Sequence, residues 1–169
     1  IMGRGAIPTN HPLYIGNLGM HGAYACNMAV SECDLLFSIG TRFNDRITGK
    51  LHSFAPKAQI IHIDIDTAAI SKNVKVDVPI VADARDALTR MLEYVEPCET
   101  KQWIEQISAW KEEHPLAAKE KPIMTPKDII ETINRRFYEL NLVTDVGQHL
   151  MFKAQFAVIT EKKKLLMFW

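Results

Sequence analysis

The stretch LLFSIGTRFNDR, residues 35–46, decides the fold class of this chain. It opens with a short apolar run, and a glycine and an arginine follow directly. Residues 59–65 and 78–81 form two further aliphatic runs that end in or near glycine or aspartate. Such runs are typical of strands buried on both faces of a parallel sheet. We therefore expect three neighbouring parallel strands.

Helical patterns alternate with these runs. Residues 24–33 and 67–73 are expected to be helical, and a third helix begins at Asp83, whose charge suits the helix dipole. The buried face of this third helix recurs at spacings of three and four residues: Ala87, Leu88, Met91, Leu92 and Val95. The alternation of strands and helices, with right-handed crossovers, predicts an α/β fold with a doubly wound parallel sheet.

The composition changes after Val95. A charged helix that contains Trp103 and Trp110 is followed by a proline- and lysine-rich stretch up to Pro122, which we interpret as a connector. Thr125 and Pro126 then predict the cap and first residue of a new helix, which leads to a strand at 142–147 and a helix from 148. The buried stripe expected for the new helix is Ile129, Ile130, Ile133, Phe137 and Leu140.

These changes divide the chain into three parts. Residues 1–95 are predicted to be most of a nucleotide-binding domain, 96–124 a helical connector, and 125–169 the start of a second α/β domain. The chain begins at Ile1 without a methionine and stops on the apolar run 165–169. We therefore expect it to be a segment of a longer polypeptide.

Composition excludes several classes of protein. The chain has 169 residues, 20 basic and 20 acidic, so no net field attracts nucleic acid or an anionic membrane. No apolar run approaches the roughly 20 residues of a membrane span. The three cysteines show no CxxC spacing, which argues against a disulfide framework and a zinc site. We expect a soluble protein of a reducing, cytosol-like compartment.

Two glycine-containing turns are candidate phosphate sites. Gly19 and Gly22 flank Met20-His21 before a predicted helix, where backbone amides suit a diphosphate, although most such pairs are simply turns. Gly40-Thr41-Arg42 follows a strand, and the Arg42 guanidinium can pair with a phosphate. The alternative is a surface ion pair of Arg42 or Arg46 with Asp45.

Other candidates are weaker in isolation. Asp64 lies near the end of its strand, where a carboxylate can accept from ribose hydroxyls or cap a helix. Gly147-Gln148-His149 is a second phosphate-sized turn after a strand. The histidines show no metal-ligand spacing, which favours structural roles for them.

The ordered motifs resemble the large catalytic subunits of acetolactate synthases, also called acetohydroxyacid synthases. The stretches that carry the resemblance are 2–8, 11–13, 18–22, 42–50, 54–56, 61–66, 72–73, 77–79 and 144–149. The resemblance covers almost the whole chain apart from the connector.

The resemblance implies a middle domain that binds FAD, followed by the start of a domain that binds thiamine diphosphate. The positions that match FAD contacts are Gly19, Met20, His21, Gly22, Gly40, Thr41, Arg42, Phe43, Asn44, Asp64, Ile65, Asp83 and Ala84. Gln148 and His149 match positions beside the thiamine diphosphate. No residue of this chain matches a catalytic residue or an Mg²⁺ ligand, because in this family those lie outside the matching segment.

The implied reaction condenses two pyruvates, or pyruvate and 2-oxobutyrate, with loss of CO₂ to 2-acetolactate or 2-aceto-2-hydroxybutyrate. It belongs to branched-chain amino-acid biosynthesis. The implied assembly is a homodimer or homotetramer with an optional small regulatory subunit. The implied location is the bacterial cytoplasm, or a plastid or mitochondrion in a eukaryote.

The chain departs from the family at Asn44, where an acid is frequent, and at Leu150-Met151-Phe152, where Gln-Met-Trp is common. Two alternatives stay open. One is a related thiamine-diphosphate enzyme of the glyoxylate carboligase or pyruvate oxidase type, and the other is a non-catalytic nucleotide-binding module.

Overall fold

The computed structural model describes residues 3–116, 123–137, 139–161 and 165–167. Contacts divide the chain into two compact units. Unit 1 comprises Ile1–Cys26 and Ile107–Trp169, and unit 2 comprises Asn27–Gln106. Of the connector predicted at 96–124, residues 117–122 lie outside the described residues.

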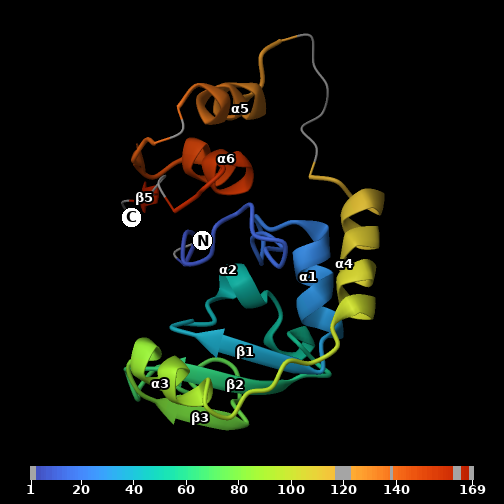
Figure 1. Cartoon of the computed structure of the whole chain (residues 1–169), viewed down its shortest axis with the longest axis vertical. Coiled ribbons are helices and arrows are strands. Elements are labelled where there is room, and N and C mark those ends of the chain that lie inside the picture. Colours follow the sequence, from blue (N-terminus) through green and yellow to red (C-terminus); the bar gives the residue numbers. More distant parts are fainter. Residues whose placement is uncertain (1–2, 117–122, 138, 162–164, 168–169) are drawn as a thin grey trace. The chain divides into compact units, whose positions relative to one another are not determined.

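Unit 2 is built on a three-stranded parallel sheet (Figure 1). Its strands, in spatial order, are β1 (Leu35–Ile39), β2 (Gln59–Asp64) and β3 (Val78–Val81). Leu35 pairs with Gln59 at the start of β1, and Asp64 pairs with Val81 at the end of β2. All three strands coincide with predicted runs, so the α/β fold with a parallel sheet is confirmed. The arrangement is consistent with a doubly wound sheet.

Short helices surround the strands. The helices and turns of this part of the chain are α1 (Tyr24–Glu32), α2 (Asp45–Thr48), the 3-10 turn η1 (Leu51–Ser53) and α3 (Ala84–Met91). The helix predicted at 67–73 is wrong, because this segment forms turns. The reason is local: the Asp66 carboxylate accepts from the Ala68 amide at 2.9 Å, a side-chain turn that competes with a helix. The buried face predicted for α3 also extends too far along the sequence. The helix ends at Met91, and Leu92 and Val95 lie beyond it and are exposed.

The core of unit 2 covers both faces of β2, because Ile60 and Ile63 point to opposite faces and both are buried. Phe43, Ile60, Val74 and Val76 form a buried cluster against Leu36 and Phe54. The prediction that the strands are buried on both faces is wrong for β1, because Leu35, Phe37 and Ile39 are all exposed. These alternate residues share one face of the strand, and the described residues leave that face open to solvent.

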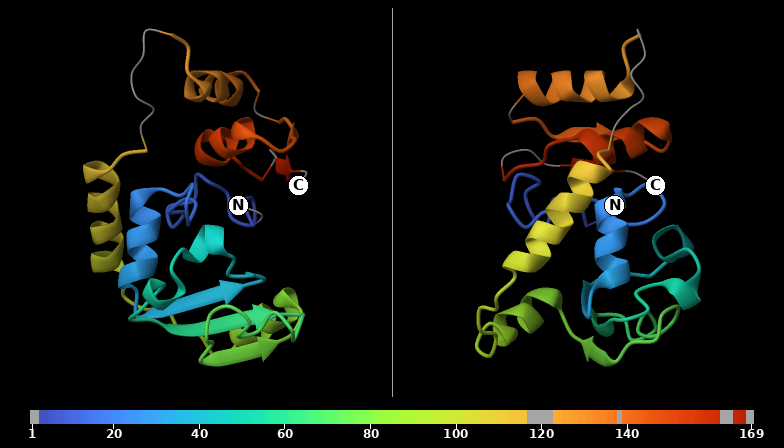
Figure 2. Two further views of the ribbon diagram at one scale, coloured as in Figure 1. Left: turned by 180° about the vertical axis from the view of Figure 1, so that it is seen from behind. Right: turned by 90° about the vertical axis from the view of Figure 1, so that its right-hand side faces the viewer.

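Unit 1 contains the remaining elements, whose helices Figure 2 shows from two further sides. They are α5 (Pro126–Arg136), β4 (Leu142–Thr144), α6 (Gln148–Phe156) and β5 (Leu165–Met167), and α4 (Lys101–Glu113) extends into this unit. β4 and β5 are parallel. Thr125 and Asp128 form the capping box of α5, as expected from the sequence. Only Ile130 of the predicted stripe is fully buried, and Ile129 and Phe137 are about half exposed.

The N-terminal segment packs on the C-terminal part of unit 1. The Thr9 amide donates to the Ile159 carbonyl at 2.8 Å, and the Ile159 amide donates to Thr9 Oγ1 at 2.9 Å. Ile159 also belongs to a buried cluster with Ile130 and Ala157. Residues about 150 positions apart in sequence are therefore held by reciprocal hydrogen bonds beside an apolar core.

Lys153 is the unusual residue of this unit. It lies on the buried face of α6 beside Leu150 and Ala154 and is 2% exposed. Its Nζ donates to Thr144 Oγ1 at 2.6 Å and to the carbonyls of Leu142 and Leu166 at 3.3 Å each. The three protons of the ammonium group thus join α6 to both strands. Burial, together with the charge of Arg4, lowers the pKa of Lys153 to about 8.

The sheet core can be tested at Ile63, which is fully buried in β2. We expect Ile63→Ala to lower the free energy of unfolding by about 2–5 kcal/mol, because it removes packed methyl groups and leaves a cavity. Ile65, which is 74% exposed just after the same strand, is the matched control, and Ile65→Ala should cost less than about 0.5 kcal/mol. Urea unfolding followed by circular dichroism measures both, and equal losses would contradict this core.

The buried ammonium of Lys153 predicts a pH dependence of stability. Its pKa is about 8 in the folded chain, against an ordinary value of 10.5. Between these values the unfolded state binds more protons, so deprotonation of Lys153 raises the free energy of unfolding as pH rises. Below pH 8 the lysine is charged in both states, and the cost of burying the charge is fully present.

Lys153→Met should lack this rise, and exposed Lys57→Met is the control. Burial raises the pKa of Tyr14 and Cys26, which lowers stability at alkaline pH in every variant. The difference between the wild-type and Lys153→Met urea curves from pH 7 to 10 therefore isolates Lys153. Parallel curves would show that Lys153 is not a buried cation.

Candidate functional site

The carboxyl ends of the three parallel strands place three sequence-predicted clusters along one edge of unit 2. Gly40 follows β1, Asp64 ends β2, and Asp83 follows β3 after one intervening residue. The Gly40 amide donates to the Ile63 carbonyl at 2.9 Å, and the Ala82 amide donates to the Asp64 carbonyl at 3.2 Å. These bonds hold the three loops next to one another, at the edge where α/β sheets bind ligands.

The loop after β1 presents an unpaired cation. Gly40 adopts a φ of +59°, and a side chain there would meet nothing within 4 Å, so the space around it is open. Arg42 is exposed, and its backbone carbonyl accepts from Asn73 Nδ2 at 2.9 Å. Within the described residues its guanidinium makes no hydrogen bond or ion pair, and neither Arg42 nor Arg46 pairs with Asp45. The surface ion pair considered as the alternative is therefore not formed there.

Two other residues of this loop, Thr41 and Phe43, make contacts within the folded chain. Thr41 Oγ1 donates to the Ile39 carbonyl at 3.4 Å. Phe43 has a φ of +47°, and its ring is 3% exposed, edge-on to Phe54 and His62. The Phe43 ring is therefore not positioned to contact a ligand. Asn44 precedes α2 and makes no side-chain capping bond.

Asp64 keeps one carboxylate oxygen available. Its Oδ1 accepts from the Asp66 amide at 2.9 Å, and Oδ2 lies 3.7 Å from His62 Nε2. His62 is fully buried, and neither ring nitrogen has a hydrogen-bond partner among the described residues. Ile65 is 74% exposed beside this carboxylate. Oδ2 of Asp64 therefore lies at the end of β2 beside a buried histidine, and the Asp64 side chain is 13% exposed.

Asp83 acts mainly as a helix cap. Its carboxylate accepts from the amides of Arg85 and Asp86, so these first-turn donors of α3 are occupied. Ala84 is the first residue of the helix. Capping a helix was the alternative role for Asp64, but no helix follows Asp64 directly, and the aspartate that caps a helix here is Asp83.

Gly19, Met20, His21 and Gly22 form a turn in unit 1. The Gly22 amide donates to the Gly19 carbonyl at 2.9 Å, and Gly19 has a φ of +96°. A Cβ on Gly22 would lie 2.3 Å from the Asn17 carbonyl oxygen, so only glycine fits. The Met20 side chain is 72% exposed at the tip of this turn. The glycines thus shape the backbone and leave Met20 free to contact a ligand.

The second phosphate-sized turn lies between β4 and α6 of unit 1. Gln148 and His149 begin α6 and are exposed. Gly147 has a φ of +147°, a backbone conformation that favours glycine, and a Cβ there would lie 2.8 Å from the exposed His149 ring. Lys153 holds the same helix to the end of β4 through Thr144. The strand–turn–helix arrangement predicted from the sequence is thus present.

One buried cation, Lys153, and one half-buried cation, Arg4, were not predicted. Lys153 shares a helix face with Leu150, Ala154 and Ala157, and a lysine at that spacing on an apolar face is a signal that the sequence offers. Arg4 offers no such signal, because its partners are distant in sequence. Among the described residues, no three His, Cys, Asp or Glu side chains are placed to hold a metal ion. No helix in the described part of the chain is long and apolar enough to cross a membrane.

Comparisons with known proteins identify the family of this chain. The family model described as "Thiamine pyrophosphate enzyme, central domain" matches residues 1–91. The chain is 40% identical over 173 residues to the acetolactate synthase large subunit of Cyanidium caldarium, covering 98% of this chain and 30% of the relative. It is 42% identical over 161 residues to that of Parasynechococcus marenigrum, covering 92% and 26%.

A third relative is the probable acetolactate synthase large subunit of Methanocaldococcus jannaschii, 43% identical over 171 residues and covering 92% of this chain and 28% of the relative. The chain therefore spans less than a third of the length of these relatives. The match of the family model extends over more than half of the chain. This chain belongs to the thiamine pyrophosphate enzyme family, whose central domain it carries in residues 1–91.

Proposed function

We propose that this chain is the FAD-binding central part, and the start of the thiamine-diphosphate-binding domain, of an acetolactate synthase large subunit. The similarity to large subunits over nearly the whole chain supports this proposal. The proposed division is 1–95, 96–124 and 125–169, and the family match at residues 1–91 supports the first boundary.

The observation that carries the flavin proposal is the set of three loops at one edge of the sheet in unit 2. Arg42 supplies a guanidinium without a partner there, which suits a diphosphate. Asp64 keeps an oxygen for a ribose hydroxyl, and the open space at Gly40 lets a ligand approach the backbone. The Asp83 carboxylate secures α3, so that the Ala84 end of the helix stays in place.

Gly19, Met20, His21 and Gly22, in the turn of unit 1, are also proposed to contact FAD, because they match FAD-contacting positions of the family that the sequence resembles. The fixed backbone at Gly22 presents the exposed Met20 thioether for contact with the flavin. Thr41, Phe43, Asn44 and Ile65 complete the set, with Phe43 contributing its backbone alone.

Gln148 and His149 are proposed to lie beside the thiamine diphosphate. When bound, that cofactor supplies the carbanion chemistry by which a 2-oxoacid loses CO₂ and adds to a second 2-oxoacid. The residues of this chain hold the turn in which Gln148 and His149 lie, through Gly147 and through the bond of Lys153 to Thr144. Mg²⁺ is proposed to be bound by residues outside this chain.

The proposed substrates are pyruvate and a second 2-oxoacid, either pyruvate or 2-oxobutyrate. The large subunit is proposed to form a homodimer or homotetramer, and a small regulatory subunit is a possible partner. We propose a location in the cytoplasm for a bacterial protein and in a plastid or mitochondrion for a eukaryotic one.

The flavin proposal is tested by Arg42→Ala. We use a chimera in which this chain replaces the matching segment of the Methanocaldococcus jannaschii relative. Loss of a charge-assisted pair costs about 1.5–3 kcal/mol, so FAD affinity should fall roughly tenfold to a hundredfold. Titration of the apo chimera with FAD, followed by flavin fluorescence, measures this affinity. Arg90→Ala, at an exposed position of α3, is the control, and unchanged FAD affinity in Arg42→Ala would refute the assignment.

The same chimera tests the activity. With thiamine diphosphate, Mg²⁺ and FAD, we expect it to form acetolactate from pyruvate. The 169-residue chain alone should form none, because it matches less than a third of the relatives and its residues match none of the family's catalytic positions. A colorimetric assay of acetoin after acid decarboxylation detects the product. A folded, FAD-loaded chimera without product would contradict the proposed function, and product from the chain alone would contradict the proposed division of the active site.

A further inference from the structure

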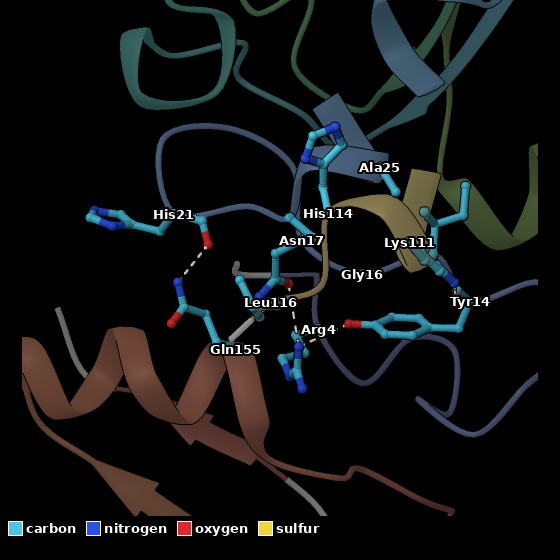
Figure 3. Close-up of a pocket in the computed structure, with 12 residues that line it drawn as sticks. Arg4, Tyr14, Gly16, Asn17, His21, Ala25, Lys111, His114, Leu116 and Gln155 are labelled. Carbon is cyan, nitrogen blue, oxygen red and sulfur yellow. Dashed lines mark hydrogen bonds between the residues drawn. The ribbon is translucent and has the colours of Figure 1, made fainter. Parts of the chain in front are cut away.

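Unit 1 contains a pocket of about 220 Å³ that the proposed function does not use. Its walls come from the N-terminal segment, the end of α4 and the following residues, and α6 (Figure 3). The polar side chains include Arg4, Tyr14, Asn17, Lys111 and Gln155. Among the described residues, no aspartate or glutamate lines it. The arginine and the lysine that line the pocket, Arg4 and Lys111, therefore give it a positive charge.

Arg4 is a cation without a counterion among the described residues. Its Nη1 donates to Tyr14 Oη at 2.8 Å and to Asn17 Oδ1 at 3.4 Å, and its Nη2 donates to the Ala157 carbonyl. All three acceptors are neutral. Its Nε is buried and finds no hydrogen-bond partner in the part of the chain that the structure describes. Burying a charge in this way is costly unless an ion of opposite sign approaches it.

A buried cation, Lys153, lies close enough to interact with the half-buried Arg4. The charge of Arg4 contributes to the lowered pKa of Lys153, after burial. Lys111 adds another positive charge at the pocket wall, where its Nζ donates to the Tyr14 carbonyl at 3.3 Å. An anion in the pocket would reduce the repulsion among these groups. The charges of this unit therefore favour an anionic occupant.

The tyrosine beside Arg4 can serve as a donor. Burial raises the pKa of Tyr14, so its hydroxyl keeps the proton. The oxygen of this hydroxyl accepts from Arg4, which leaves its hydrogen for another acceptor. In Figure 3 the Tyr14 hydroxyl and the Arg4 side chain point toward each other, so that an oxyanion could be shared by both.

The remaining walls are apolar and limit the size of the ligand. Ile15, Ala23, Ala25 and Leu116 contribute aliphatic surface. The volume is below the roughly 300–1,000 Å³ of pockets for drug-sized molecules. A compact ligand with one anionic end and a short hydrocarbon end fits both the charges and the walls.

We propose that this pocket binds a small monocarboxylate with a short aliphatic chain, its carboxylate paired with Arg4 and its chain packed against Leu116 and Ala25. The proposal is independent of the flavin site in unit 2. His21 belongs to both the proposed flavin turn and the pocket lining, but in Figure 3 its imidazole points away from Arg4.

The first test compares two ligands of one shape on the unchanged 169-residue chain. We titrate 3-methylbutanoate and its neutral amide, 3-methylbutanamide, and follow the ¹H–¹⁵N signal of Arg4 Nε by NMR. The carboxylate should shift this signal saturably, and the amide should bind at least tenfold more weakly, because it cannot form the charge-assisted pair. Equal affinity for both ligands, or no saturable shift with the carboxylate, would overturn the proposal.

Two further ligands test the apolar walls. Acetate lacks the aliphatic chain and should bind at least fivefold more weakly than 3-methylbutanoate. Inorganic phosphate carries more charge but no hydrocarbon, and it should also be weaker. Tighter binding of phosphate than of 3-methylbutanoate would show an oxyanion site of another kind and would overturn the assignment to a carboxylate with a chain.

Variants locate the site. Arg4→Met should weaken 3-methylbutanoate binding at least tenfold, and Arg136→Met, an exposed arginine of α5 in the same unit, should leave it unchanged. Isothermal calorimetry measures both. Because Arg4 also bonds to Ala157, the second variant is Leu116→Trp, which fills the pocket from a partly exposed position. It should weaken binding at least fivefold, and wild-type affinity in folded Leu116→Trp would place the ligand elsewhere and refute the proposal.

Discussion

Parallel pairing of β1, β2 and β3 is the constraint on which the candidate nucleotide site depends. Parallel strands end on the same side, so the loops that follow them must share one edge. The bonds from Gly40 to Ile63 and from Ala82 to Asp64 continue the ladder past the strands and fix those loops. Arg42 and Asp64 are more than 20 residues apart in sequence, and both thereby lie at the sheet edge where α/β proteins bind ligands.

Unit 1 depends on a different interaction, the hydrogen bonding of buried cations to neutral oxygens. Lys153 binds Thr144 and the carbonyls of both strands, and Arg4 binds Ala157 together with Tyr14. These bonds satisfy the donors only in part, because Arg4 Nε is left without a partner. They also leave the charges uncompensated within the described residues. The geometry of these hydrogen bonds is specific, but the uncompensated charges cost free energy. A bound anion would lower that cost.

The sequence predicted the elements of the fold better than their burial. Aliphatic runs predicted β1, β2 and β3 because strand residues in a parallel sheet are selected for shape and apolarity. The exposed face of β1 could not be predicted, since exposure depends on what else packs there. The turns after Asp66 were missed because a side-chain hydrogen bond outweighed a weak helical pattern. At the site, Arg42 and Asp64 were found from their place after strands, whereas Arg4 required knowledge of contacts across more than 150 residues.

Arg42 and Arg4 differ in what their charges cost the folded chain. Arg42 is exposed, so water satisfies its donors, and a ligand displaces that water without prior strain on the protein. Arg4 is largely shielded, and its pKa is lowered by burial, which shows that the surroundings disfavour its charge. A ligand at either arginine stabilises the folded chain if it does not bind the unfolded one. A counterion at Arg4 would in addition offset the cost of shielding that charge from water, whereas a diphosphate at Arg42 would gain mainly from pairing with an exposed cation.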